Sequence, residues 1–161
     1  MECYKEAIRI DPNNAKTYND IGDIFLNEER LEEAINHYND AIRINPNCAI
    51  YYSNKGNALD GLGRREEAME CYKEATRIDP NDADAYNDIG TISHNEERYE
   101  EAIKHYNDAI RINPNKALYY TNKGNALFWL GRREEATECY KEVIRIDPNA
   151  VGAYYSINYL L

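Results

Sequence analysis

Apolar residues recur along this chain at the spacing of a helix that has one apolar side. Ala34, Tyr38, Ala41 and Ile42 stand at i, i+4, i+7 and i+8, which places them on one face of a helix. Pro46 follows, and its ring cannot continue the helical hydrogen bonding. Before this helix lies another run without proline, ended by a short polar break. The pattern predicts pairs of amphipathic helices, and no segment has the alternation of a strand.

The same pattern repeats along the whole chain. Its five prolines are spaced 34 residues apart, at Pro12, Pro46, Pro80, Pro114 and Pro148. Aligning residues 1–68 with residues 69–136 gives 54 identities and 14 differences, so two kinds of 34-residue repeat alternate. Because one helix pair of this length is too short to bury its own apolar face, we expect neighbouring pairs to stack on each other.

Small and aromatic residues hold fixed places in each repeat. The glycines are Gly22, Gly56, Gly90 and Gly124, and the alanine–tyrosine pairs are Ala34 with Tyr38, Ala68 with Tyr72, Ala102 with Tyr106 and Ala136 with Tyr140. With the 34-residue period, this order resembles the tetratricopeptide repeat over essentially the whole chain. The resemblance implies an all-α fold, an α-solenoid of antiparallel helix pairs forming a right-handed superhelix. We expect glycine and alanine to let paired helices approach closely, with the tyrosines filling the space around them.

The repeat frame predicts a single solenoid domain over residues 1–161. Its predicted parts are a half-repeat at 1–14, full repeats at 15–48, 49–82, 83–116 and 117–150, and a half-repeat at 151–161. The first half-repeat has only a second helix and the last has only a first helix, which is typical of a piece of a longer array. The unmatched apolar faces at the two ends predict weak head-to-tail self-association.

The turn inside each repeat differs between odd and even repeats. Even repeats have Gly63 and Gly131 where odd repeats have Glu29 and Glu97. Glycine at this place is typical of a helix that ends in the left-handed conformation. The glutamates are therefore expected either to be strained, by about 1 kcal/mol, or to form a turn of another shape.

The charge and the cysteine content of the chain limit the classes of partner, metal site and compartment that suit it. Acidic residues outnumber basic ones 29 to 19, so nucleic acid and anionic membranes are unsuitable partners and neutral or basic peptides are suitable ones. No apolar run reaches membrane-spanning length.

Cys3, Cys71 and Cys139 share one repeat position with His37 and His105, but stacked repeats hold such positions too far apart to share one metal ion. We therefore predict no metal and no cofactor. Unpaired thiols favour a reducing, cytoplasmic compartment.

The sequence shows no catalytic constellation. The histidines, His37, His94 and His105, have no serine or cysteine nucleophile at a motif spacing. Carboxylate pairs such as Glu32 and Glu33 fall beside the starts of second helices, where they favour the helix dipole. The sequence therefore predicts a protein that is not an enzyme.

The family resemblance implies a binding surface on a concave wall, formed mostly by the first helix of each repeat. The positions that face this groove in the family hold short amide, carboxylate and hydroxyl groups here. Such groups donate to and accept from a peptide main chain, which favours an extended peptide of loosely specified sequence. The asparagines predicted to bind the peptide are Asn19, Asn54, Asn57, Asn87, Asn122 and Asn125. An ordinary solvated helix face is the alternative. The lysines that chaperone-binding members use at the fifth position are missing.

The fourth repeat breaks the symmetry of the chain. Phe128 and Trp129 stand where the second repeat has an Asp-Gly pair. Exposed aromatic residues make good binding anchors, so these two are predicted to anchor the peptide, and Leu118, Tyr155 and Tyr159 can join them. The alternative is that both rings simply pack against the terminal helix. Two classes of function stay open: a protein or peptide-binding scaffold, and a self-associating structural or spacer segment.

Overall fold

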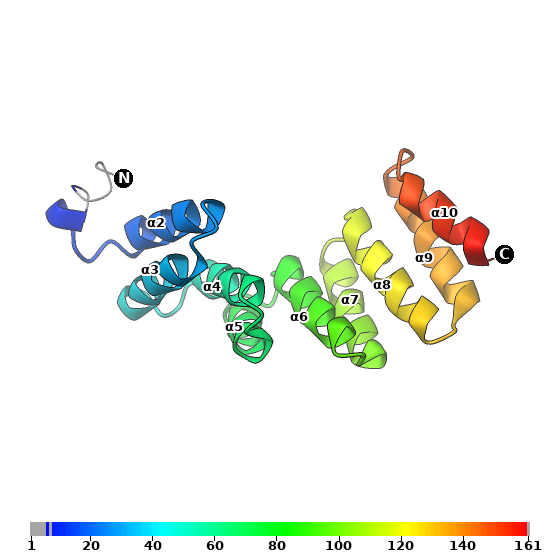
Figure 1. Cartoon of the computed structure of the whole chain (residues 1–161), viewed down its shortest axis with the longest axis horizontal. Coiled ribbons are helices and arrows are strands. Elements are labelled where there is room, and N and C mark those ends of the chain that lie inside the picture. Colours follow the sequence, from blue (N-terminus) through cyan, green and yellow to red (C-terminus); the bar gives the residue numbers. More distant parts are fainter. Residues whose placement is uncertain (1–5, 7, 161) are drawn as a thin grey trace. The chain divides into compact units, whose positions relative to one another are not determined.

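The structure is a computed structural model of the chain, and it describes residue 6 and residues 8–160. After a short helical stretch at 8–10, these residues form nine helices: α2 (Ala15–Asn27), α3 (Leu31–Ile44), α4 (Ala49–Gly61), α5 (Arg65–Ile78), α6 (Ala83–Asn95), α7 (Tyr99–Ile112), α8 (Ala117–Trp129), α9 (Arg133–Ile146) and α10 (Val151–Leu160) (Figure 1). The described residues include no strand. The predicted all-α fold of paired helices is confirmed.

Contacts between residues divide the chain into two compact units, unit 1 (residues 1–80) and unit 2 (residues 81–161), and each is described by itself. In unit 1, α2 pairs with α3 and α4 pairs with α5, while in unit 2 α6 pairs with α7 and α8 pairs with α9 (Figure 1). Within each unit, a second helix also packs against the first helix that follows it, as α3 does on α4 in unit 1, and as α7 does on α8 and α9 on α10 in unit 2. Of the predicted half-repeat at 1–14, residues 1–5 and 7 lie outside the described residues. That residues 1–161 form a single solenoid domain stays a prediction.

The contact between paired helices depends on glycine. A Cβ atom on Gly22 would lie 2.5 Å from Cε1 of Tyr38, and one on Gly90 would lie 2.6 Å from Cε1 of Tyr106. Both tyrosine rings are fully buried, so neither has free space to move into. The close approach expected from the small residues is therefore present in both units, with the tyrosines filling the space beside it.

The turn between paired helices is left-handed in odd and even repeats alike. The backbone φ is 59° at Glu29 and 60° at Glu97, against 74° at Gly63 and Gly131. In the first of these turns, the backbone N–H of Arg30 donates to the carbonyl of Phe25 over 2.9 Å, a bond typical of a left-handed helix end. Of the two alternatives predicted for the glutamates, the left-handed turn is therefore confirmed; for a residue other than glycine this conformation typically costs about 1 kcal/mol.

Candidate functional site

In unit 1, two of the predicted site residues bind each other. Nδ2 of Asn54 donates to Oδ1 of Asn19 and to Oδ1 of Asp23, both over 3.0 Å. Nδ2 of Asn19 donates to Oδ2 of Asp23 over 3.0 Å, and the Tyr38 hydroxyl donates to Oδ1 of Asp23 over 2.8 Å. The Asp23 carboxylate thus links α2, α3 and α4. Both N–H bonds of the Asn54 amide are directed at acceptors within the repeats, so this amide helps to hold the helices together.

Unit 2 has a simpler network at the same place. Nδ2 of Asn122 donates to Oδ1 of Asn87 over 2.9 Å, and Nδ2 of Asn87 donates to Oδ1 of Asp88 over 3.3 Å. Thr91 takes the place of the Asp23 carboxylate, and its hydroxyl donates to the carbonyl of Asn87 over 3.0 Å. The Asn87 side chain is buried, with 4% exposed. Asn19 in unit 1 and Asn87 in unit 2, both at the fifth position of their repeats, therefore take part in the packing of the repeats rather than in an open face.

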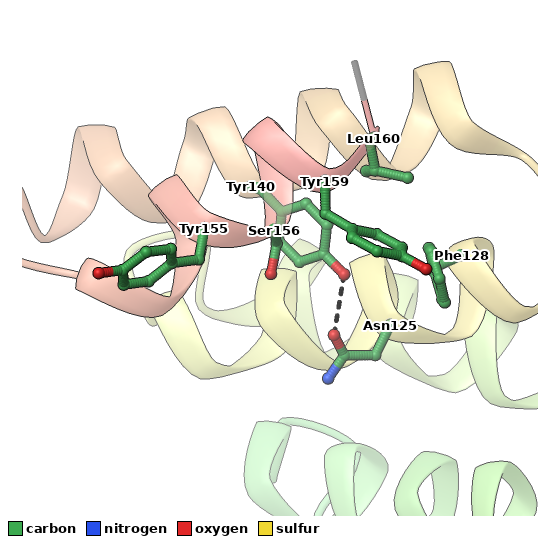
Figure 2. A pocket seen from close by; sticks show the side chains of 7 residues that line it. All are labelled: Asn125, Phe128, Tyr140, Tyr155, Ser156, Tyr159 and Leu160. Carbon is green, nitrogen blue, oxygen red and sulfur yellow. Dashed lines mark hydrogen bonds between the residues drawn. The ribbon is translucent and has the colours of Figure 1, made fainter.

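The remaining two asparagines present their amides differently. Oδ1 of Asn57 accepts from the Tyr72 hydroxyl over 2.7 Å, and Oδ1 of Asn125 accepts from the Tyr140 hydroxyl over 2.9 Å. Both asparagines are exposed. Because the tyrosine fixes the oxygen, the amide nitrogen is turned away from it, as Figure 2 shows for Asn125. Among the six predicted asparagines, these two are exposed and can donate from their amide nitrogens.

A pocket of about 470 Å³ lies among α8, α9 and α10 of unit 2. It is lined by Asn125, Phe128, Tyr140, Tyr155, Ser156, Tyr159 and Leu160 (Figure 2). Its walls are mostly rings and aliphatic carbon, and its polar groups are one amide and several hydroxyls. Tyr155 and Tyr159 are 72% and 76% exposed, so the pocket opens to solvent beside them.

At the pocket, the two positions that form an asparagine bridge between α2 and α4 and between α6 and α8 hold shorter side chains. Asn19 with Asn54 and Asn87 with Asn122 are pairs 35 residues apart, and the next such pair is Thr121 with Ser156. The Thr121 hydroxyl donates to the carbonyl of Ala117 over 3.1 Å, and the Ser156 hydroxyl donates to that of Gly152 over 3.0 Å. Each short side chain bonds to its own helix, so no amide spans the space between α8 and α10.

Phe128 and Trp129, predicted as a pair, lie in different surroundings. Phe128 is half-buried and its ring lies 5.9 Å from that of Tyr159 on α10, so it packs against the terminal helix and lines the pocket at the same time. Trp129 is 63% exposed and its ring stacks on Tyr99 of α7, with centroids 6.4 Å apart and planes 9° apart. Phe128 therefore packs against the terminal helix, as one alternative predicted. Trp129, the last residue of α8, packs against Tyr99 of α7 instead.

The predicted site residues fall into separate groups. Asn125 and Phe128 meet in the pocket, whereas Asn57 lies on α4 in unit 1. Sequence reasoning did not single out Tyr140, Ser156 or Leu160 as pocket residues. For Ser156 a signal exists, since the other repeats have aspartate or asparagine at its position. The role of all these residues in binding stays a prediction.

Other chemistry gives no competing site in the part of the chain that the structure describes. There, no three side chains of His, Cys, Asp or Glu are grouped so that they could hold a metal ion. Burial raises the pKa of the Cys71 and Cys139 thiols, which favours the unreactive protonated form at neutral pH. Among the described helices, none combines the length and the apolar character needed to cross a membrane.

Several solved structures have the same fold. A crystal structure of MamA matches with a TM-score of 0.84 and 23% identity, over 92% of this chain and 87% of that chain. YrrB, described as a TPR protein with an unusual peptide-binding site, matches with a TM-score of 0.83 and 22% identity, over 98% and 81%. PilF of Pseudomonas aeruginosa matches with a TM-score of 0.83 and 21% identity, over 91% and 67%. At such identities the likeness shows the fold alone. A comparison with curated proteins found no match.

Models of protein families match nearly the whole chain. A model described as TPR repeat matches residues 22–63, 61–96 and 90–131. Two further models, both described as tetratricopeptide repeat, match residues 117–150 and 3–36. Together with the helix pairs and their glycine–tyrosine contacts, these matches show that the chain belongs to the tetratricopeptide repeat family.

Proposed function

We propose that this chain is a non-enzymatic scaffold that binds an extended, neutral-to-basic peptide or partner segment along its first-helix face. We define this face in each unit as the side of the first helices that carries the predicted asparagines. Proteins of the tetratricopeptide repeat family are generally protein-interaction scaffolds, and YrrB, which has the same fold, is described as having a peptide-binding site. The observation that carries the proposal is the open pocket on this face of α8 and α10.

The charge and the donors of the face support a peptide ligand. The excess of acids over bases, 29 to 19, attracts basic peptides and repels acidic ones. The exposed amides of Asn57 and Asn125, each held by a tyrosine hydroxyl, are fixed donors for main-chain carbonyls. Asn19 and Asn87 are buried, and in this proposal they position their neighbours.

The test is selection from a library of displayed random peptides, followed by titration of the selected peptides. We expect peptides that bind with micromolar affinity, more weakly as salt rises, because long-range attraction to the acidic chain is screened. Asn57→Ala and Asn125→Ala each remove one hydrogen bond to the peptide, besides the bond accepted from the tyrosine hydroxyl, and should weaken binding roughly 2–10-fold. Asn39, exposed on the second helix α3, provides the control, and Asn39→Ala should bind as the wild type does. No selected peptide, or equal binding by all three variants, would contradict the proposal.

Self-association is a second candidate, favoured by the exposure of α10. Val151, Tyr154 and Tyr159 are 62%, 47% and 76% exposed on this helix. The occupant is the start of a second copy, because residues 1–13 match residues 69–81 at twelve of thirteen positions and the matched segment lies largely in α5, the partner of α4. Tyr4 corresponds to Tyr72, whose ring meets Gly56.

Sedimentation velocity over a range of concentrations tests this candidate. We expect the average mass to rise with concentration and the Tyr4→Glu variant to stay monomeric with an unchanged melting temperature. Wild-type protein that remains strictly monomeric at millimolar concentration would exclude stacking of this kind.

A further inference from the structure

The pocket between α8 and α10 differs in chemistry from the rest of the first-helix face. None of its seven lining residues carries a charge, and four of them are aromatic. On the same face of unit 2, α6 carries Asp84 and Asp88. This face therefore changes within one unit from carboxylates on α6 to rings on α10.

We propose that this pocket selects one large uncharged side chain, aromatic or aliphatic, from an extended peptide, while Nδ2 of Asn125 donates to a main-chain carbonyl of the same peptide. The inference rests on the proposed function and names the residue class that the site recognises. A volume of about 470 Å³ lies in the range typical of sites that enclose small ligands, and the exposed rings of Tyr155 and Tyr159 would be covered on binding.

A charged side chain is unsuited to this pocket. A lysine or arginine placed over the ring of Phe128 or Tyr159 would lose hydrating water, and no lining residue is a carboxylate. The carboxylate of Asp84 already binds Lys116 over 2.5 Å and accepts from the Tyr119 hydroxyl over 2.8 Å. Rings and Leu160 gain instead from contact with another apolar group.

Asn125 gives the pocket a polar contact with a defined direction. Its Oδ1 accepts from the Tyr140 hydroxyl, which leaves Nδ2 as the amide's donor (Figure 2). The nearby hydroxyls of Thr121 and Ser156 donate to carbonyls of their own helices. The ligand atom that suits Nδ2 is therefore an acceptor, and a peptide carbonyl next to the anchored residue supplies one.

The first experiment uses blocked single amino acids and needs no known partner. The N-acetyl methylamides of phenylalanine, leucine, arginine and glutamate are titrated to millimolar concentration, and nitrogen–proton NMR spectra are recorded. We expect phenylalanine and leucine to shift the side-chain amide signals of Asn125 and the backbone signals of Phe128, Ser156 and Tyr159. Larger shifts with arginine or glutamate, or no shift at these residues with any probe, would overturn the inference.

The role of the pocket can also be tested with substitutions to residues that other repeats have at the same positions, since those residues are compatible with the fold. Tyr159→Thr installs the residue found at the same position of the third repeat, Thr91, and should weaken phenylalanine binding at least tenfold. The double variant Thr121→Asn with Ser156→Asn rebuilds the amide bridge that joins α2 to α4 and α6 to α8, so it should fill the pocket and abolish the shifts. The control is Tyr154→Phe, on the same helix but outside the pocket lining.

The two proposals fail in different ways. If displayed peptides bind but their affinity is unchanged in Tyr159→Thr and in the filled double variant, the pocket is not the anchor and the scaffold function stands. If the blocked phenylalanine shifts persist in the filled variant, they arise elsewhere and the inference is wrong. If no displayed peptide binds at all, the proposed function itself fails.

Discussion

In unit 1, Asp23 accepts hydrogen bonds from Asn19, Asn54 and Tyr38, whereas its counterpart in unit 2, Thr91, donates to the carbonyl of Asn87. Both residues occupy the same position of a first helix. The segments that contain them, residues 1–68 and 69–136, are identical at 54 positions. The charged acceptor ties three helices together in unit 1, whereas in unit 2 the neutral hydroxyl of Thr91 stands in its place and contacts Tyr106 of α7. The comparison teaches that the repeated residues set the helix packing, while a few differences decide which hydrogen bonds the side chains of the first-helix face make between helices.

A second difference between the units involves two positions at once. In unit 1, a Cβ on Gly61 would lie 3.0 Å from Cδ1 of Leu31, so glycine suits the leucine beside it. In unit 2 the corresponding residues are Trp129 and Tyr99, whose rings stack. The enlarged side chain at one position is matched by a flat ring at the other. The pair explains how a tryptophan takes the place that glycine has in the second repeat.

The largest loss of stability is expected from substitutions that break a contact present in both units. Gly22→Leu and Gly90→Leu each place a side chain against a buried tyrosine ring, and each should destabilise the protein by about 1–3 kcal/mol. Thermal melting followed by circular dichroism measures both variants. Gly152, where an added Cβ would meet nothing within 4 Å, provides the control as Gly152→Ala. A neutral result for either leucine variant would show that the helices do not meet closely there.

The next largest loss of stability is expected to differ between the two units. Asn54→Ala removes two donated hydrogen bonds, one of them to a carboxylate, and should cost about 1–2 kcal/mol. Asn122→Ala removes one bond to a neutral amide and should cost about 1 kcal/mol or less. Urea unfolding of both variants at pH 7 gives the two values. If Asn122→Ala proves the more damaging, the carboxylate of Asp23 is not what makes the unit 1 network stronger.

These networks mark the limit of what the sequence predicts. The period of the prolines and the apolar spacing predicted the helix pairs, because helix formation and proline act locally along the chain. The left-handed turn at Glu29 was also predictable, since Gly63 occupies the same repeat position. The fate of the Asn54 amide was not, because it depends on side chains that meet across repeats. The pocket was missed for the same reason: it lies where Thr121 and Ser156 form no bridge between α8 and α10.

A smaller effect concerns the turns, in which odd and even repeats differ. Glu29→Gly and Glu97→Gly should each stabilise the protein by roughly 0.5–1 kcal/mol, because the relieved strain exceeds the added freedom of glycine in the unfolded chain. The reverse change, Gly63→Glu, should destabilise by a similar amount, since its φ of 74° is also left-handed. Denaturant midpoints measure all three. A loss of stability in both glycine variants would mean that the glutamates are not strained.

The smallest effect is a pH dependence that unit 2 has and unit 1 lacks at one position. His94 of unit 2 corresponds to Leu26 of unit 1, and its Nδ1 is buried with no hydrogen-bond partner. Its ring meets the edge of Tyr99 with centroids 5.2 Å apart. Burial lowers the pKa of His94 from its ordinary value of 6.5, because the charged imidazolium would lose its hydration.

The sign follows from which state binds the proton. With its pKa lowered in the folded protein, His94 takes up a proton more readily when the chain is unfolded, so stability falls as the pH drops below about 6.5 and levels off below the folded pKa. His37 has a pKa lowered by burial as well, so the wild-type curve contains both contributions. His94→Leu copies unit 1 and removes one of them. Melting temperatures from pH 7.5 to pH 5 should therefore fall less steeply for His94→Leu than for the wild type. Equal slopes would mean that His94 protonates as easily folded as unfolded, and that this difference between the units has no consequence for acid stability.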